Sequence, residues 1–169
     1  MNAVSDPAVL RALVARVWSF AWRVTEDAPL AEAMVAKACH ASVEPGHPVG
    51  ERETLVRMLA AAHSVLRSGS AYDRYERARR AALGTAAGRH RRSRAADNHT
   101  RILAEFHTLA PPERASLLLA EVEGLTYEES AAVLGVSVDR AKLAHVSVRL
   151  KLGRAFSEHT RQSALPASR

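Results

Sequence analysis

The feature that most constrains how this sequence folds is a pattern of two capped helices joined by a turn at a single glycine. Thr126 and Glu129 have the spacing of a capping box, in which each side chain accepts the other residue's backbone N–H at the start of a helix. Gly135 ends this short helix because glycine adopts left-handed backbone without strain, and Ser137 caps a longer helix that extends to about Phe156. The pattern predicts a helix-turn-helix, although it also fits a helical hairpin that only packs.

The rest of the chain has the apolar spacing of helices as well. Apolar residues recur three and four positions apart, and an aromatic content of only 5% favours helix over strand. We therefore expect an all-α protein with two small helical domains joined by a basic linker. The expected parts are a helical domain over 1–67, the linker over 68–98, a helix-turn-helix domain over 99–156 and a tail over 157–169. The first expected helix starts at Pro7, after a cap at Ser5 or Asp6. Further helices are expected over 29–43, 51–67 and 98–108, and another is expected to start at Pro111.

Positive charge is concentrated between the two expected domains. The chain has a formal net charge of +6, and arginines outnumber acids over 68–98. Such a segment fits both a solvated tether and a strip along nucleic acid phosphates, and the two interpretations are compatible. We expect it to be helical over 72–83 and open around 84–88. The arginines expected to contact phosphate are Arg89, Arg91, Arg92 and Arg94.

Several classes of protein find no support in the sequence. The single cysteine, Cys39, excludes an internal disulfide and favours a reducing compartment. Neither a secretory signal nor an apolar run of membrane-spanning length is visible, so we expect a cytoplasmic protein without a membrane partner. The histidines lack zinc-ligand spacing, and no nucleophile beside a base and no glycine-rich phosphate loop is present. We therefore expect no enzyme activity, cofactor, metal or small-molecule substrate.

The C-terminal third carries a run of residues typical of one family. Residues 109–138, LAPPERASLLLAEVEGLTYEESAAVLGVSV, resemble the promoter-reading C-terminal domain of bacterial extracytoplasmic-function (ECF) sigma factors. The hallmarks are a helix started by proline, the EGLTYEE and AAVLGV segments, and a recognition helix after them. Residues 17–24 and 31–35 look like the family's polymerase-binding helices. The resemblance implies a protein that binds RNA polymerase core with its N-terminal domain and promoter DNA with its recognition helix.

Two N-terminal helices differ from that family's pattern. Where the family's second helix has acidic and amide residues, this chain has Ala33, Ala36 and Lys37. Where the family's third helix has residues that contact the promoter, this chain has His63 and the alanines at 60–61. These changes are similar to the sigma-like domain of antagonists in the general stress response, which mimic a sigma factor and capture its anti-sigma factor. Such a sigma mimic is the alternative function.

The expected recognition helix has an inner and an outer face. Ala141, His145 and Val148 have the spacing to pack inward, which leaves the forked donors of Arg140 free to read base edges. The residues expected to bind DNA on this helix are Arg140, Lys142, Leu143, Ser147, Arg149 and Lys151. The residues expected to bind a protein, either RNA polymerase core or an anti-sigma factor, are Glu32, Met34, Lys37, Leu143, Val146 and Leu150.

Overall fold

Every regular element that the structure describes is a helix, which confirms the all-α class. The computed structural model describes residues 6–42, 50–67, 72–73, 75–81 and 98–163. The elements are α1 (Pro7–Thr25), α2 (Ala28–Ser42), α3 (Glu51–Ser64), the 3-10 turn η2 (Val65–Arg67), α5 (Asn98–Thr108), α6 (Pro111–Glu121), α7 (Tyr127–Leu134) and α8 (Val138–Ser163). Residues 75–81 are also helical, within the segment expected to be so, and the expected open stretch at 84–88 lies outside the described residues.

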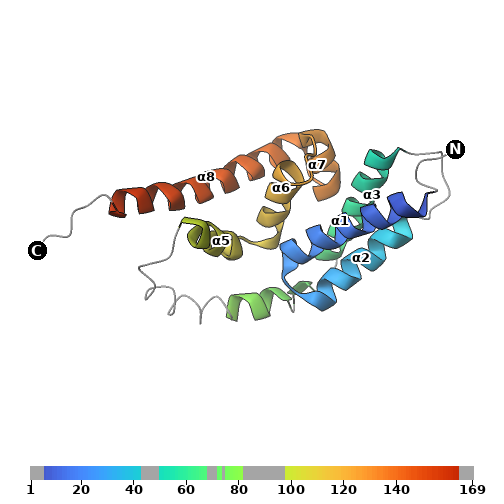
Figure 1. Cartoon of the computed structure of the whole chain (residues 1–169), viewed down its shortest axis with the longest axis horizontal. Coiled ribbons are helices and arrows are strands. Elements are labelled where there is room, and N and C mark those ends of the chain that lie inside the picture. Colours follow the sequence, from blue (N-terminus) through green and yellow to red (C-terminus); the bar gives the residue numbers. More distant parts are fainter. Residues whose placement is uncertain (1–5, 43–49, 68–71, 74, 82–97, 164–169) are drawn as a thin grey trace, which may run out of the picture.

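The first three helices enclose one apolar core. α1 starts as its sequence predicts, with the Asp6 carboxylate accepting a hydrogen bond from the Ala8 backbone N–H at 2.8 Å and proline in the first turn. Its apolar stripe packs against α2 and α3, which also pack against each other (Figure 1). The fully buried side chains of this core are Leu13, Val17, Ala21, Val24, Ala31, Met34, Ala38, Met58, Leu59 and Ala62.

The C-terminal helices pack around the inner side of α8. Helices α5, α6 and α7 each contact α8, the long helix that runs from α7 along the upper side of Figure 1. Leu119 on α6 and Val133 on α7 are fully buried, and Ala141 on α8 is nearly so. These three helices therefore share an apolar core built from the face that the periodicity of each predicts.

The N-terminal and C-terminal helices are docked on each other. Helix α3 lies against α7 and α1 lies against α6, and a single cluster of buried side chains extends from Leu13 on α1 to Ala141 on α8. The sequence left open whether the two units dock or swing. The domain boundaries at 67 and 98 remain predictions.

Arginines supply the polar contacts across this interface. The Arg16 guanidinium lies 2.8 Å from the Glu123 carboxylate. Arg52 on α3 donates to both carboxylate oxygens of Glu129 at 2.6 Å and to the Gly124 carbonyl at 2.9 Å. The hydrogen bond from Arg52 lowers the pKa of Glu129 to about 2. The docked arrangement is thus held by planar, two-pronged arginine contacts, which are among the stronger charge-assisted hydrogen bonds.

A buried arginine joins α6 to the end of α1. The side chain of Arg114 is only 1% exposed, and its guanidinium donates to the carbonyls of Phe106 at 3.1 Å and Val24 at 3.4 Å. It also lies 3.3 Å from the Glu26 carboxylate and over the Phe106 ring, 5.4 Å from its centroid. A buried charge is tolerated only when it is paired and hydrogen-bonded, and Arg114 meets both conditions.

Replacing Arg114 by methionine tests this junction. The variant leaves buried carbonyls without donors, so we expect the free energy of unfolding to fall by about 3 kcal/mol. Arg149→Met is the matched control, because the Arg149 side chain is mostly exposed and should cost less than about 0.5 kcal/mol. Denaturant titrations measure both. Equal losses in the two variants would contradict a stabilising role for the buried guanidinium.

His63 on α3 is buried without a hydrogen-bond partner among the described residues. Both of its ring nitrogens are inaccessible, so the promoter contact that its position suggests is closed to it in this structure. Burial, and to a lesser degree the nearby charge of Arg67, lowers the pKa of His63 to about 4. The folded protein therefore holds this imidazole neutral.

This burial predicts a pH dependence of stability. Because the pKa of His63 is lower in the folded than in the unfolded chain, its neutral form favours folding above about pH 6.5, and that contribution is lost as the pH falls towards 4. The loss amounts to about 3 kcal/mol between pH 7 and pH 4. Denaturation of the wild type and of His63→Leu at several pH values isolates it. Parallel pH profiles for the two proteins would show that His63 does not titrate in this way.

Candidate nucleic-acid interface

The turn between α7 and α8 has the geometry that the sequence predicts. The Glu129 carboxylate accepts the Thr126 N–H at 2.7 Å, and the Thr126 hydroxyl accepts the Glu129 N–H at 3.2 Å, which completes the capping box. Gly135 has a φ of 67°, and its N–H donates to the Ala131 carbonyl at 2.8 Å. The left-handed glycine directs the chain out of α7 and into α8.

A second constraint acts on the same glycine. Arg67 donates to the Leu134 carbonyl at 3.1 Å, and a Cβ added at Gly135 would lie only 1.5 Å from Nη1 of Arg67. Gly135 is therefore needed both for its backbone conformation and for the close approach of an arginine from η2. The sequence predicts the left-handed backbone at Gly135, but nothing in it indicates the close approach of Arg67.

The inner face of α8 is fixed by apolar and polar contacts together. Ala141 and Val148 are buried, as expected, and so is His145. Nε2 of His145 lies 2.9 Å from a carboxylate oxygen of Glu121 on α6, and Nδ1 lies 3.1 Å from the hydroxyl of Tyr127 on α7. One imidazole thus joins three helices and fixes the rotation of α8 about its own axis. The sequence predicted that His145 points inward but not these two partners.

The outer face of α8 is open along its first half. Leu143 is 69% exposed, and Arg140, Lys142 and Ser147 are exposed beside it. Within the part of the chain that the structure describes, the side chains of Arg140 and Lys142 form no ion pair. Two cations, a hydroxyl and apolar side chains are therefore available to another macromolecule near the start of this helix.

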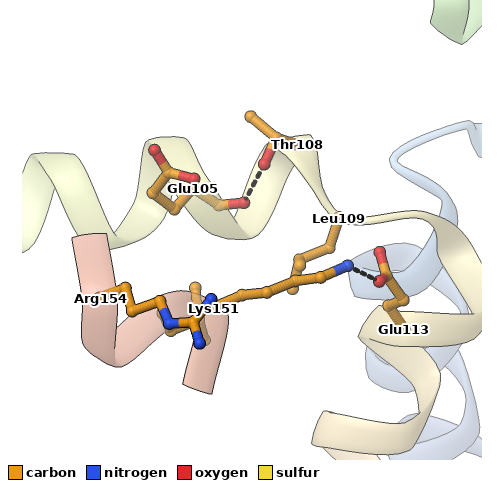
Figure 2. A pocket seen from close by; sticks show the side chains of 7 residues that line it. Glu105, Thr108, Leu109, Glu113, Lys151 and Arg154 are labelled. Carbon is orange, nitrogen blue, oxygen red and sulfur yellow. Dashed lines mark hydrogen bonds and ion pairs between the residues drawn. The ribbon is translucent and has the colours of Figure 1, made fainter. Parts of the chain in front are cut away.

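The remaining cations predicted on α8 are engaged by acids of the neighbouring helix. Arg149 lies 3.6 Å from Glu121. Lys151 forms an ion pair with Glu113, as Figure 2 shows, beside a pocket between α5, α6 and α8. Burial raises the pKa of Glu113, but hydrogen bonds from Lys151 and from the Ala110 N–H outweigh it and leave that pKa below its ordinary value. Lys151 thus extends towards α6.

The other predicted site residues fall into four groups. Met34 was expected at a protein interface but is fully buried, because its place in the apolar stripe of α2 turns it into the core. Glu32 and Lys37 are exposed on the other side of that helix. The exposed apolar residues of α8, already predicted as partner contacts, include Val146 and Leu150. The linker arginines Arg89, Arg91, Arg92 and Arg94 lie outside the described residues.

A capped helix, a glycine turn and a second helix with an open cationic face define the class of helix-turn-helix proteins. Residues 99–154 match the family model for Sigma-70, region 4. This segment is thus similar to a sigma-70 region 4 domain, and the match supports the ECF-like sigma factor that the sequence resembles. Such a domain indicates a role in promoter recognition, and the family is in general not enzymatic. No curated protein and no solved structure matches the chain.

None of the described helices has the length and hydropathy to cross a membrane. No group of three or more histidine, cysteine or acidic side chains in these ranges could hold a metal ion. The exposed face of α8 is the candidate site for contact with another macromolecule.

Alanine substitutions at two glycines separate the constraints on the turn. Gly124 and Gly135 both have positive φ, but a Cβ at Gly124 meets open space. We expect Gly124→Ala to cost about 1 kcal/mol from backbone strain alone, and Gly135→Ala to cost about 1 kcal/mol more because Arg67 loses its hydrogen bond. Thermal or denaturant unfolding measures the difference. If the excess persists in an Arg67→Ala background, the contact with Arg67 is not its cause.

Proposed function

We propose that the chain is an ECF-type sigma factor that recognises a promoter through α8 and binds RNA polymerase core through its N-terminal helices. The observation that carries the proposal is the exposed start of α8, with Arg140 and Lys142 unpaired among the described residues, in a region 4 domain. Because sigma factors act on the chromosome, a cytoplasmic location is part of the proposal.

The residues of α8 suit different kinds of DNA contact. Arg140 lies in the first turns of the helix, the part of a recognition helix that reaches base edges, and its fork matches the two acceptors of guanine. Ser147 can donate to a base or a phosphate, and Lys142 serves as a point charge for phosphate. Glu32 and Lys37, which are exposed on α2, are the proposed contacts with polymerase.

One specific observation favours a second function. Leu143, Val146 and Leu150 are all exposed on α8, at the spacing of an amphipathic helix that inserts into a groove of another protein. A sigma mimic that captures an anti-sigma factor would use this apolar stripe. Its complex would survive high salt, since apolar contacts are not screened, whereas binding through phosphate contacts weakens steeply as salt rises.

Reconstitution with core polymerase distinguishes the two functions. The sigma factor is expected to direct run-off transcripts from genomic DNA upstream of genes. Absence of transcripts together with a salt-resistant complex with an anti-sigma factor would support the mimic instead. Leu143→Ser and Leu150→Ser would then abolish that complex.

Two basic residues on the same helix make a matched pair for DNA binding. We expect Arg140→Ala to weaken specific binding by about 1 to 3 kcal/mol and to relax the preference at one base pair. Lys151→Ala removes the same charge from a side chain held by Glu113, so it should change affinity far less. Fluorescence anisotropy with a labelled promoter fragment measures both variants. Equal losses would show that charge alone, and not the open face of α8, determines binding.

A further inference from the structure

The contact between the two groups of helices encloses polar atoms that have no partner. Helix α3, which carries His63, lies against α7, which carries Ser130. Both ring nitrogens of His63 and the hydroxyl of Ser130 are buried, and none of them forms a hydrogen bond within the part of the chain that the structure describes. Buried polar atoms without a partner cost free energy and are rare in native proteins, so each requires an explanation.

Helical spacing places His63 between the two arginines that hold α7. Arg52 precedes it by about three turns and Arg67 follows it by about one, so the three side chains lie on one side of α3 and η2. From this side, Arg52 donates to Glu129 near the start of α7. Arg67 donates to the Leu134 carbonyl at the end of the same helix. The imidazole is therefore enclosed where the two groups of helices meet.

The charges around His63 disfavour a proton on its ring. Burial, and after it the charge of Arg67, lowers the pKa of His63. On α7, Glu129 is already paired with Arg52 and Glu128 is exposed. The charged and titratable side chains at exposed positions of α1 and α2 are Arg11, Arg16, Arg23, Glu32, Lys37 and His40. An imidazolium in the closed contact would consequently lie near a guanidinium group, with no buried acid of the described residues to pair with it.

We propose that His63 makes the docking of the two groups of helices sensitive to pH, so that α3 separates from α7 when the imidazole is protonated while the helices of each group stay packed. Separation gives the imidazolium access to water and loses only the contacts between the groups, whereas unfolding would also lose the apolar packing within each group. It uncovers the side of α7 that α3 covers. The proposal does not depend on the proposed function, because docking is measured without DNA or polymerase.

The direction of the pH response follows from the protonation of each group at the contact. The pKa of His63 is about 4 when the contact is closed and returns towards 6.5 when water reaches the ring, so docking is favoured above about pH 6.5 and weakens as the pH falls towards 4. The hydrogen bond from Arg52 holds the pKa of Glu129 at about 2, so this ion pair persists over the same range. The loss of docking is therefore assigned to His63.

Fluorescence energy transfer in the full-length chain measures the docking. Ala36→Cys on α2 and Ser147→Cys on α8, both at exposed positions, carry the two dyes, and Cys39→Ala removes the native thiol. Between pH 7 and pH 4 the equilibrium constant for docking should fall by roughly 100-fold. Transfer should fall with it while the far-UV circular dichroism stays unchanged. The same measurement with Arg52→Ala, which removes one contact across the interface, shifts the equilibrium towards separation and enlarges the response.

Three histidine variants assign the response to one residue. His63→Leu cannot be protonated and should keep transfer constant between pH 7 and pH 4. His63→Gln, which is also neutral at every pH, serves the same purpose should the leucine variant fail to fold. His40→Gln removes an exposed histidine of α2 and should respond like the parent chain.

Three results would overturn the proposal. The first is constant transfer down to pH 4 in both the parent and the Arg52→Ala chains. The second is an equal fall of transfer in the His63 variants, which would assign the response to another group. The third is a loss of circular dichroism at the same pH as the loss of transfer, because acid would then unfold the helices instead of separating them.

Discussion

The contacts of His145 are the constraint on which the account of α8 depends. Its two nitrogens face Glu121 and Tyr127, on two different helices, and the buried Ala141 and Val148 lie on the same side of α8. A helix fixed on one face in this way presents the opposite face without freedom to rotate. The exposure of Arg140 and its neighbours therefore follows from how the inner face is packed, and a rigid helix is what a base-reading element requires.

Arginine has distinct roles in different parts of this basic protein. Arg52 and Arg67 bind acceptors across the interface between the two groups of helices, and Arg114 satisfies buried carbonyls. The side chains of Arg11 and Arg140 contact no described acid. The net charge of +6 is thus a poor guide to where polyanions bind, because many of the cations are used within the fold. A better guide to where polyanions bind is whether an arginine side chain has an acceptor among the described residues.

Local features of this fold could be predicted from the sequence, whereas long-range contacts could not. The capping box at Thr126, the left-handed Gly135 and the inward face of α8 all depend on residues a few positions apart. The pairing of Arg52 with Glu129 joins residues 77 positions apart, and periodicity does not indicate which helices meet. Met34 was expected to contact a protein partner, but it lies on the apolar side of α2, and the structure shows that this side is core. Lys151 lies on the predicted helix, but only the fold brings Glu113 to it.

The central claim is that the open face of α8 meets promoter DNA while its inner face stays packed. A photo-crosslinking residue at Leu143, in a complex of the chain with core polymerase and promoter DNA, tests it most directly. The account predicts cross-links to bases of the upstream promoter element from this position and none when the same residue replaces Ala141, which is buried. Cross-links from position 143 to protein alone, or to DNA equally from both positions, would contradict it.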